Sequence, residues 1–227
     1  SGDAPLDVTV SPKTSGYHIA RVTSNDGTNT ILSETGFYAS GTDFVPWGRG
    51  DGDQVELVSD KPRYKPGETA KILIKSPYKD ATALVTYERD LILHSYTTKL
   101  VGNAPVIEVP LTEEHLPNLY VSVMLLRGRV AAEVEDPEED AGKPAFKIGY
   151  IDLPVAPDSQ RLKVEVKTDK PKYGPGEEVT TTLKVTDAAG QPVQAELSLT
   201  AADVGVLNLI DYQTPDFFDT FYGSLPL

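Results

Sequence analysis

The feature that most constrains this sequence is a nine-residue phrase that occurs twice. Residues 60–68 read DKPRYKPGE and residues 169–177 read DKPKYGPGE, so seven of nine positions match at an offset of 109 residues. This offset is close to the length of one small β-sandwich domain. Proline then glycine suits a type II turn, because proline fixes φ and glycine accepts a positive φ. The phrase therefore predicts a corner between the first two strands of a module that occurs at least twice. The alternative is two unrelated turns, which the similar strand pattern around both copies disfavours.

Between residues 54 and 154, polar and apolar residues alternate in seven short runs separated by turn signals. Seven strands in about 100 residues are typical of an immunoglobulin-type or fibronectin-type sandwich. The 18 glycines and 18 prolines also favour an all-β chain that is rich in turns. We therefore predict one complete antiparallel β-sandwich domain over residues 48–155. Its expected strands are Gln54–Val58, Thr69–Lys75, Ala81–Glu88, Leu91–Lys99, Pro105–Leu111, Leu119–Arg127 and Ala145–Leu153.

The flanking sequences offer fewer strands than a complete module needs. Residues 1–47 contain two runs joined by Asn25-Asp26-Gly27, which is a strong hairpin signal, and we predict a C-terminal remnant of a preceding domain. After a proline-containing linker at 154–160, residues 156–227 are predicted to form the N-terminal portion of a following domain. The expected flanking strands are Tyr17–Ser24, Ile31–Ser40, Leu162–Lys167, Val179–Thr186, Val193–Ala201 and Val204–Ile210.

The composition is acidic, with 34 aspartates and glutamates against 21 lysines and arginines, a net charge of −13. This charge repels nucleic acid and anionic membrane surfaces, so we expect neither as a partner. Cysteine is absent, which excludes disulfides, thiolate nucleophiles and cysteine-ligated metals from the chain.

Residues that carry enzyme chemistry are scattered. His18, His94 and His115 lack the spacing of metal ligands, and no serine lies in a nucleophile-elbow motif. No glycine-rich phosphate-binding loop is present either. We therefore predict that the chain is not an enzyme and has no catalytic residues, no cofactor and no metal.

Two polar runs allow a binding interpretation beside a plain one. Glu133–Asp140 holds enough carboxylates for a calcium site but lacks a pattern that converges ligands, so a solvated loop is expected. Arg49-Gly50-Asp51 matches the tripeptide of integrin ligands, but it lies in a glycine-rich stretch that we expect to be an interdomain linker.

The last 17 residues, 211–227, concentrate aromatic side chains without strand-like alternation, and we call them the tail. Such a segment either packs on a neighbouring surface or presents an adhesive patch. Pro215 and Pro226 disfavour a central strand, because proline cannot donate a ladder hydrogen bond. The aromatic residues of the tail are Tyr212, Phe217, Phe218, Phe221 and Tyr222.

Several segments together resemble the bacterial branch of the alpha-2-macroglobulin family. The repeated phrase resembles the opening of macroglobulin-like domains, and residues 47–51 (WGRGD) resemble the junction between two of them. Residues 118–123 (NLYVSV) resemble a penultimate strand of such a domain. Residues 201–209 (AADVGVLNL), 212–216 (YQTPD) and 221–223 (FYG) are similar to the segment that leads into the bait region. The resemblance implies an all-β chain of tandem macroglobulin-like domains, of which 156–227 would carry the bait.

The resemblance also implies a function: a broad-spectrum endopeptidase inhibitor that closes around a protease after its bait is cleaved. Its partners would be the trapped proteases and neighbouring domains of the same chain, in the bacterial periplasm or cell envelope, or otherwise outside the cell. Tyr212, Phe217, Phe218, Phe221 and Tyr222 would then lie on the approach to the bait. Without cysteine, the chain itself can contain no thioester.

A structural or adhesive cell-surface array of β-sandwiches is the alternative function, because tandem acidic modules suit it equally well. An array predicts seven uninterrupted strands in the second module, whereas a bait-bearing domain predicts a break after the fourth. An enzyme with an accessory β-sandwich has no supporting residues in the sequence.

Overall fold

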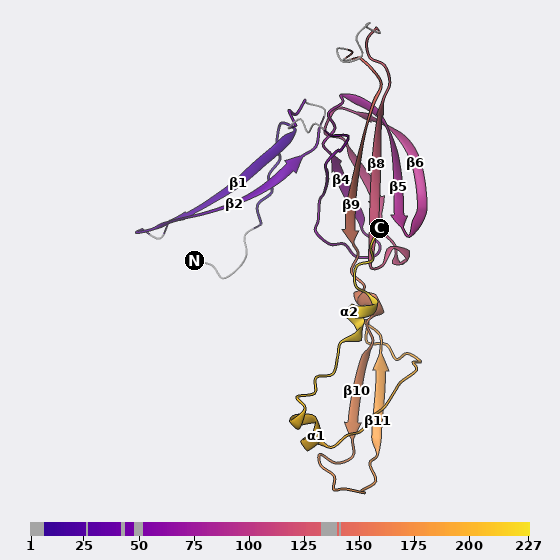
Figure 1. Cartoon of the computed structure of the whole chain (residues 1–227). Helices are drawn as coiled ribbons and strands as arrows, with labels where there is room; N and C mark the ends of the chain where they lie inside the picture. The colour runs from indigo at the N-terminus through magenta and orange to yellow at the C-terminus, as the bar shows by residue number, and fades with distance from the viewer. Residues whose placement is uncertain (1–6, 26, 42–43, 48–51, 133–139, 141) are drawn as a thin grey trace.

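The computed structural model describes residues 7–25, 27–41, 44–47, 52–132, 140 and 142–227, and the chain is all-β (Figure 1). Two 3₁₀ turns and two short helices accompany the strands. The elements are β1 (Gly16–Asn25), β2 (Thr30–Ala39), β3 (Leu57–Ser59), β4 (Thr69–Ile74), β5 (Asp80–Arg89), β6 (Leu91–Val101), β7 (Val106–Pro110), η1 (Glu113–His115), β8 (Asn118–Arg127), β9 (Ala145–Pro154), η2 (Asp158–Gln160), β10 (Lys163–Thr168), β11 (Thr181–Thr186), α1 (Val204–Leu209) and α2 (Phe217–Phe221).

Strands β3 to β9 form a sandwich of two antiparallel sheets. One sheet has the order β3-β4-β7 and the other β6-β5-β8-β9. All seven strands predicted between residues 54 and 154 are present, with boundaries that differ by at most three residues. The division into domains at 48 and 155 stays a prediction.

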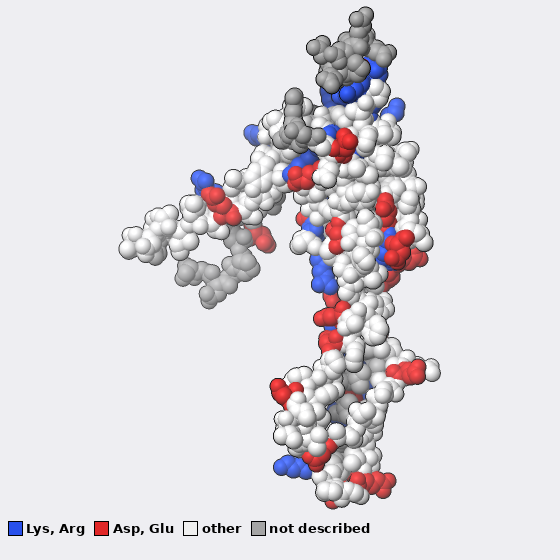
Figure 2. Space-filling view, in the orientation of Figure 1, with Lys and Arg blue, Asp and Glu red and all other residues white. Residues whose placement is uncertain are grey.

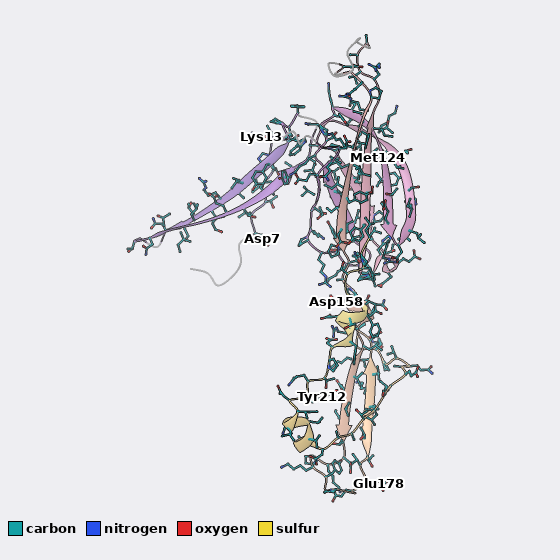
Figure 3. The ribbon with its side chains drawn as sticks, in the orientation of Figure 1. Asp7, Lys13, Met124, Asp158, Glu178 and Tyr212 are labelled. Carbon is teal, nitrogen blue, oxygen red and sulfur yellow. The ribbon has the colours of Figure 1, made fainter. Side chains whose placement is uncertain are left out.

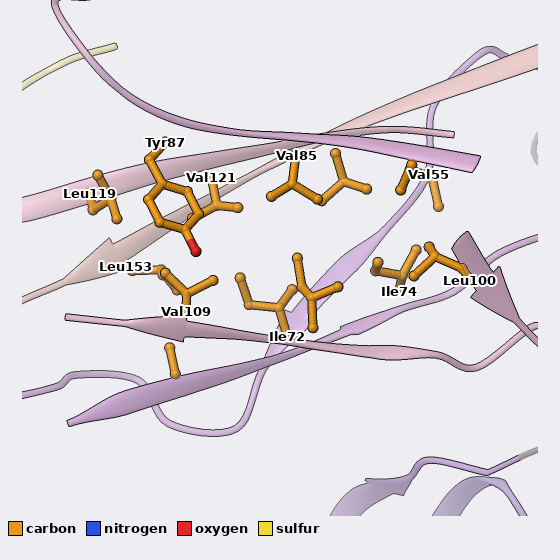
Figure 4. Close-up of a cluster of buried hydrophobic side chains, with 14 of the residues drawn as sticks. Val55, Ile72, Ile74, Val85, Tyr87, Leu100, Val109, Leu119, Val121 and Leu153 are labelled. Carbon is orange, nitrogen blue, oxygen red and sulfur yellow. The ribbon is translucent and has the colours of Figure 1, made fainter. Parts of the chain in front are cut away.

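The inner faces of the two sheets meet in one hydrophobic core (Figure 4). Alternation in the sequence places every second residue inside: Ile72 and Ile74 of β4 face Val121 and Val123 of β8, and all four are fully buried. The burial of one face fixes the register of each strand, because a shift of one residue would turn the apolar side chains outward.

The repeated phrase forms the same structure in both copies. Gly67 and Gly176 have φ of 90° and 81°, the left-handed conformation that the predicted Pro-Gly turn requires. The hydroxyl of Tyr64 donates to Asp60 Oδ1 at 2.7 Å, and that of Tyr173 donates to Asp169 Oδ1 at 2.5 Å.

The first copy also closes the sandwich. The Tyr64 amide donates to the Pro154 carbonyl at 2.9 Å, and the Ala156 amide donates to the Tyr64 carbonyl at 2.7 Å. The start of the sandwich is therefore held to its last strand by backbone hydrogen bonds.

The β1–β2 hairpin is paired through all ten residues of each strand, from Gly16↔Ala39 to Asn25↔Thr30, as the Asn-Asp-Gly signal predicted. Asp26 itself lies outside the described residues. The chain after this hairpin docks on the sandwich through Asn103, which is buried and bonds to both the N–H and the C=O of Val45. The Trp47 indole donates to the Asn103 carbonyl at 2.6 Å. Asn103 therefore holds residues 45–47 on the sandwich, just before the glycine-rich interdomain stretch.

After the sandwich, β10 and β11 form a second antiparallel hairpin, as predicted. The predicted strands Val193–Ala201 and Val204–Ile210 are wrong. Residues 193–201 contain no strand, and they are held to β11 by one hydrogen bond, from Val193 N to Val185 O at 3.3 Å. Residues 204–209 form α1 instead, because the Asp203 carboxylate accepts hydrogen bonds from the next amides and caps a helix.

No helix among the described residues is long and apolar enough to cross a membrane. On the face drawn in Figure 2, acidic and basic side chains are interspersed over the sandwich and the second hairpin.

Candidate functional site

The tail leaves α1 as an extended chain and then forms α2. The Tyr212 amide caps α1 by donating to the Leu207 carbonyl at 3.0 Å. Tyr212 lies on the chain between α1 and α2 (Figure 3), and α2 lies between the sandwich and the β10–β11 hairpin (Figure 1). Asp216 begins α2, since its side chain accepts a hydrogen bond from the Phe218 amide at 2.9 Å.

The five aromatic residues predicted as the bait approach divide into two groups. Tyr212, Phe217 and Phe221 are 52%, 61% and 76% exposed. Phe218 and Tyr222 are half-buried and contact each other, with ring centroids 4.7 Å apart. Three side chains of the tail are thus exposed to solvent, while two pack inward.

Arg161, which directly follows the 154–160 linker and caps η2, holds the inward-facing side of α2. Its guanidinium lies 4.0 Å from the centroid of the Phe218 ring and pairs with Asp216 at 2.9 Å and Asp219 at 3.5 Å. Hydrogen bonds from Arg161 and the Phe218 amide hold the pKa of the Asp216 carboxyl below its usual value.

The end of the tail bonds to the sandwich through Asn118, the first residue of β8. Its amide nitrogen donates to the Leu225 carbonyl at 3.0 Å and to Asp152 Oδ1 at 2.8 Å. Its amide oxygen accepts from the Leu225 N–H at 2.9 Å. Residues 107 positions apart in sequence are therefore joined.

The loop around η1 contacts the linker as well. Glu113 accepts hydrogen bonds from Ser159 and Gln160 at 3.2 and 3.0 Å. His115 completes a capping box, in which its Nδ1 accepts from the Thr112 amide at 3.0 Å. Only a neutral imidazole can accept at Nδ1, so protonation of His115 breaks this bond.

This loop should lose stability in mild acid. Burial, and then the Arg89 guanidinium, lower the pKa of the His115 imidazole, while Glu114 opposes them. A histidine whose pKa is lowered by folding contributes full stability above its unfolded pKa of about 6.5 and loses it as the pH falls towards the folded pKa. We expect the urea midpoint of the sandwich to fall between pH 7 and pH 5, and to fall less in His115→Gln, whose amide oxygen still accepts. An equal fall in both proteins would contradict this role.

None of the other sequence candidates forms a catalytic or metal-binding constellation within the described part of the chain. His18 bonds to the Thr14 carbonyl and His94 packs on Tyr87, and no group of three or more His, Asp or Glu that could hold a metal is found among described residues. Residues 133–139 of the acidic run and 49–51 of the linker lie outside the described residues. Asp140 pairs with Arg129 at 2.8 Å.

A groove of about 1220 Å³ between the first hairpin and the sandwich is lined by three cationic side chains. All three already bond within the chain: Lys75 to Glu56 at 2.5 Å, Arg127 to the Lys143 carbonyl at 2.9 Å and Lys147 to the Gly52 carbonyl. We therefore take the tail, and not this groove, as the candidate site.

A model of the alpha-2-macroglobulin bait region domain matches residues 55–209. The chain belongs to the alpha-2-macroglobulin family. The resemblance predicted from the repeated phrase and the segments after residue 200 is thereby confirmed, and the matched range ends two residues before the tail begins.

Bacterial members of the family are similar to three quarters or more of the chain. An alpha-2-macroglobulin homolog of Nostoc sp. is 34% identical over 225 residues, which covers 98% of this chain and 12% of that protein. Alpha-2-macroglobulin of Escherichia coli is 29% identical over 176 residues, 76% of this chain and 10% of that protein. The chain thus spans roughly a tenth of the length of these curated relatives.

Solved structures of the family also align. A crystal structure of Salmonella alpha-2-macroglobulin reacted with methylamine covers 94% of this chain and 13% of its own at 24% identity, with a TM-score of 0.39. A cryo-EM reconstruction of native Escherichia coli alpha-2-macroglobulin also covers 94% of this chain and 13% of its own, at 22% identity with a TM-score of 0.41.

Sequence reasoning missed two residues that fix the tail, Asn118 and Arg161. Asn118 was noticed as part of a family-like segment but without a role. A polar residue at the start of a mostly apolar strand was the available signal, since buried amides need partners. Arg161 gave no signal, because its partners lie 55 and 58 residues further along.

Proposed function

We propose that this chain belongs to a protease-trapping inhibitor and forms the approach to its bait segment. The observation that carries this proposal is the tail: Tyr212, Phe217 and Phe221 are exposed within a segment that follows the matched bait region domain. In this function a protease cleaves the bait, a constrained conformation is released, and the parent protein closes around the protease.

The tail has the physical properties of a cleavage target. Proteases bind extended or locally unfolded chain, and α2, at five residues, is too short to be stable without its contacts. Exposed aromatic side chains suit proteases with deep apolar specificity pockets.

The alternative of a structural or adhesive array predicts further strands after β11. Residues 193–227, all of which the structure describes, contain two short helices and no strand. The second module is therefore interrupted after its second strand, β11, which does not fit an array of seven uninterrupted strands but comes two strands earlier than the break predicted for a bait-bearing domain. The proposal accordingly depends on the exposed tail and the family match, and not on this strand count. We further propose that the parent protein acts on proteases in the bacterial periplasm or cell envelope.

Limited digestion with a chymotrypsin-like protease and with a broad-specificity protease tests the proposal. We expect the first cuts after Ile210, beginning at Tyr212 and continuing at Phe217 or Phe221, while residues 54–154 stay intact. Replacement of these three aromatic residues by serine should slow tail cleavage by the chymotrypsin-like protease about tenfold or more. Mass spectrometry of the early fragments locates each cut.

The matched control is Tyr17→Ser, which removes an equally exposed aromatic residue (58%) from a paired strand and should leave the digestion pattern unchanged. First cuts at residues 133–140, with a resistant tail, would contradict the proposal.

A further inference from the structure

Asn118 is buried beneath the tail, which provides two of the three hydrogen bonds of its side chain. The side chain is 0% exposed, yet the sandwich itself provides one partner, Asp152. The other two bonds come from the N–H and C=O of Leu225. Without the tail, the Asn118 amide would lose both Leu225 bonds and its cover together, and water would have to replace them.

The way Asn118 binds Leu225 imitates a neighbouring strand. A carboxamide presents a C=O and an N–H side by side, as the C=O and N–H of a single residue in an antiparallel strand do, so it pairs with the backbone of Leu225 whatever the side chain there. We call this contact the sandwich anchor.

The contact of Arg161 with Asp216 and Phe218 is a second attachment, which we call the linker anchor. A guanidinium that pairs with a carboxylate and stacks on a ring is held in a defined geometry, which distinguishes it from an ordinary surface ion pair. The two anchors hold residues 216 and 225 to different parts of the chain, and α2 lies between them.

The anchors also determine which aromatic residues face outward. Positions four apart lie on one face of a helix, so Phe217 and Phe221 form one pair, and Phe218 with Tyr222 the other. Arg161 holds the second pair inward, which leaves the first pair exposed. Tyr212 precedes both anchored segments in the chain, so a protease can reach it while both anchors stay closed.

We propose that Asn118 and Arg161 are positioning residues that keep residues 216–225 closed, so that a protease reaches Tyr212 directly and Phe221 only after the anchors open. The order of cleavage rests on the proposed function, whereas the anchors themselves do not. Cleavage at Phe221 should therefore follow the population of the open tail.

The test compares the full chain with Arg161→Gln and Asn118→Ala by two measurements. The first is the rate of cleavage at Phe221 relative to Tyr212 by a chymotrypsin-like protease. We expect each variant to raise this ratio about fivefold, by the loss of one charge-assisted or buried contact. The second is amide hydrogen exchange of residues 216–225, which should become faster in both variants by a similar factor.

Controls separate the possible failures. Arg161→Lys should restore part of the wild-type ratio, and Arg63→Gln, at an exposed arginine outside the anchors, should change neither measurement. Arg161 is exposed, so its variant tests the proposal even where Asn118→Ala unfolds the sandwich. Faster exchange without any tail cleavage would leave the anchors standing and overturn the proposed function. Unchanged exchange and an unchanged ratio in Arg161→Gln would overturn the anchors.

Discussion

Tyr64→Ala should lower the free energy of unfolding of the sandwich by about 3–5 kcal/mol. Tyr173→Ala, at the equivalent position of the repeat, should lower the stability of the β10–β11 module by only about 1 kcal/mol. Tyr64 is 1% exposed and belongs to the main core, while Tyr173 is half-buried. Both hydroxyls donate to an aspartate and accept from a lysine amide, so the two sites differ in burial and not in hydrogen bonding. The comparison therefore isolates the packing contribution within one conserved turn geometry of the same chain.

Urea denaturation followed by circular dichroism provides the measurement. Tyr64→Phe should cost about 1–2 kcal/mol, because it removes only the hydroxyl and leaves Asp60 with one donor fewer. Burial and the hydrogen bond to Asp60 raise the pKa of Tyr64 to about 12, so the hydroxyl stays protonated at neutral pH. Equal destabilisation by the two alanine variants would show that the ring of Tyr64 is not part of the core.

The parts of the fold that were predictable from sequence are those that repeat or alternate. The two copies of the phrase predicted the corner, because Pro66 and Pro175 fix φ locally and Gly67 and Gly176 permit the positive φ that follows, whatever surrounds them. The strands of the sandwich followed from period-2 alternation, since one face of each had to be buried in a two-layer core. Both signals are local in sequence, so no knowledge of the tertiary structure was needed.

The strand that was wrongly predicted and the contact that was missed have different causes. Val204–Ile210 alternates weakly and was predicted as a strand, but Asp203 caps a helix there and no neighbouring strand offers a ladder. The Asp203 cap was readable in the sequence and was overlooked. The contact between Asn118 and Leu225 could not be predicted from the sequence, because a side chain that binds a backbone 107 residues away leaves no periodic pattern.

Gly149→Ala should destabilise the sandwich by about 3 kcal/mol, although glycine to alanine is usually favourable in a strand. A methyl group at Gly149 would overlap the Val55 carbonyl oxygen and lie 3.0 and 3.1 Å from side-chain carbons of Val55 and Leu57. The Val55 backbone cannot move away easily, because its amide donates to the Ile148 carbonyl at 3.0 Å. The Ile148 amide in turn donates to the Asp53 carbonyl at 2.7 Å, so residues 53–55, which lead into β3, are held alongside β9 by a bond on each side of Gln54.

Gly128→Ala is the matched control, since a methyl group there meets nothing within 4 Å and the residue is exposed at the end of the sandwich. We expect its free energy of unfolding to stay within about 0.5 kcal/mol of wild type. Hydrogen exchange should locate the Gly149→Ala effect in residues 53–59 and 145–149, which must separate to admit the methyl group. If both variants are equally stable, the close approach of Val55 to Gly149 is not needed by the fold. Residues 53–59 would then be free to shift, and the corner that follows would be held by the burial of Tyr64 and by its hydrogen bonds.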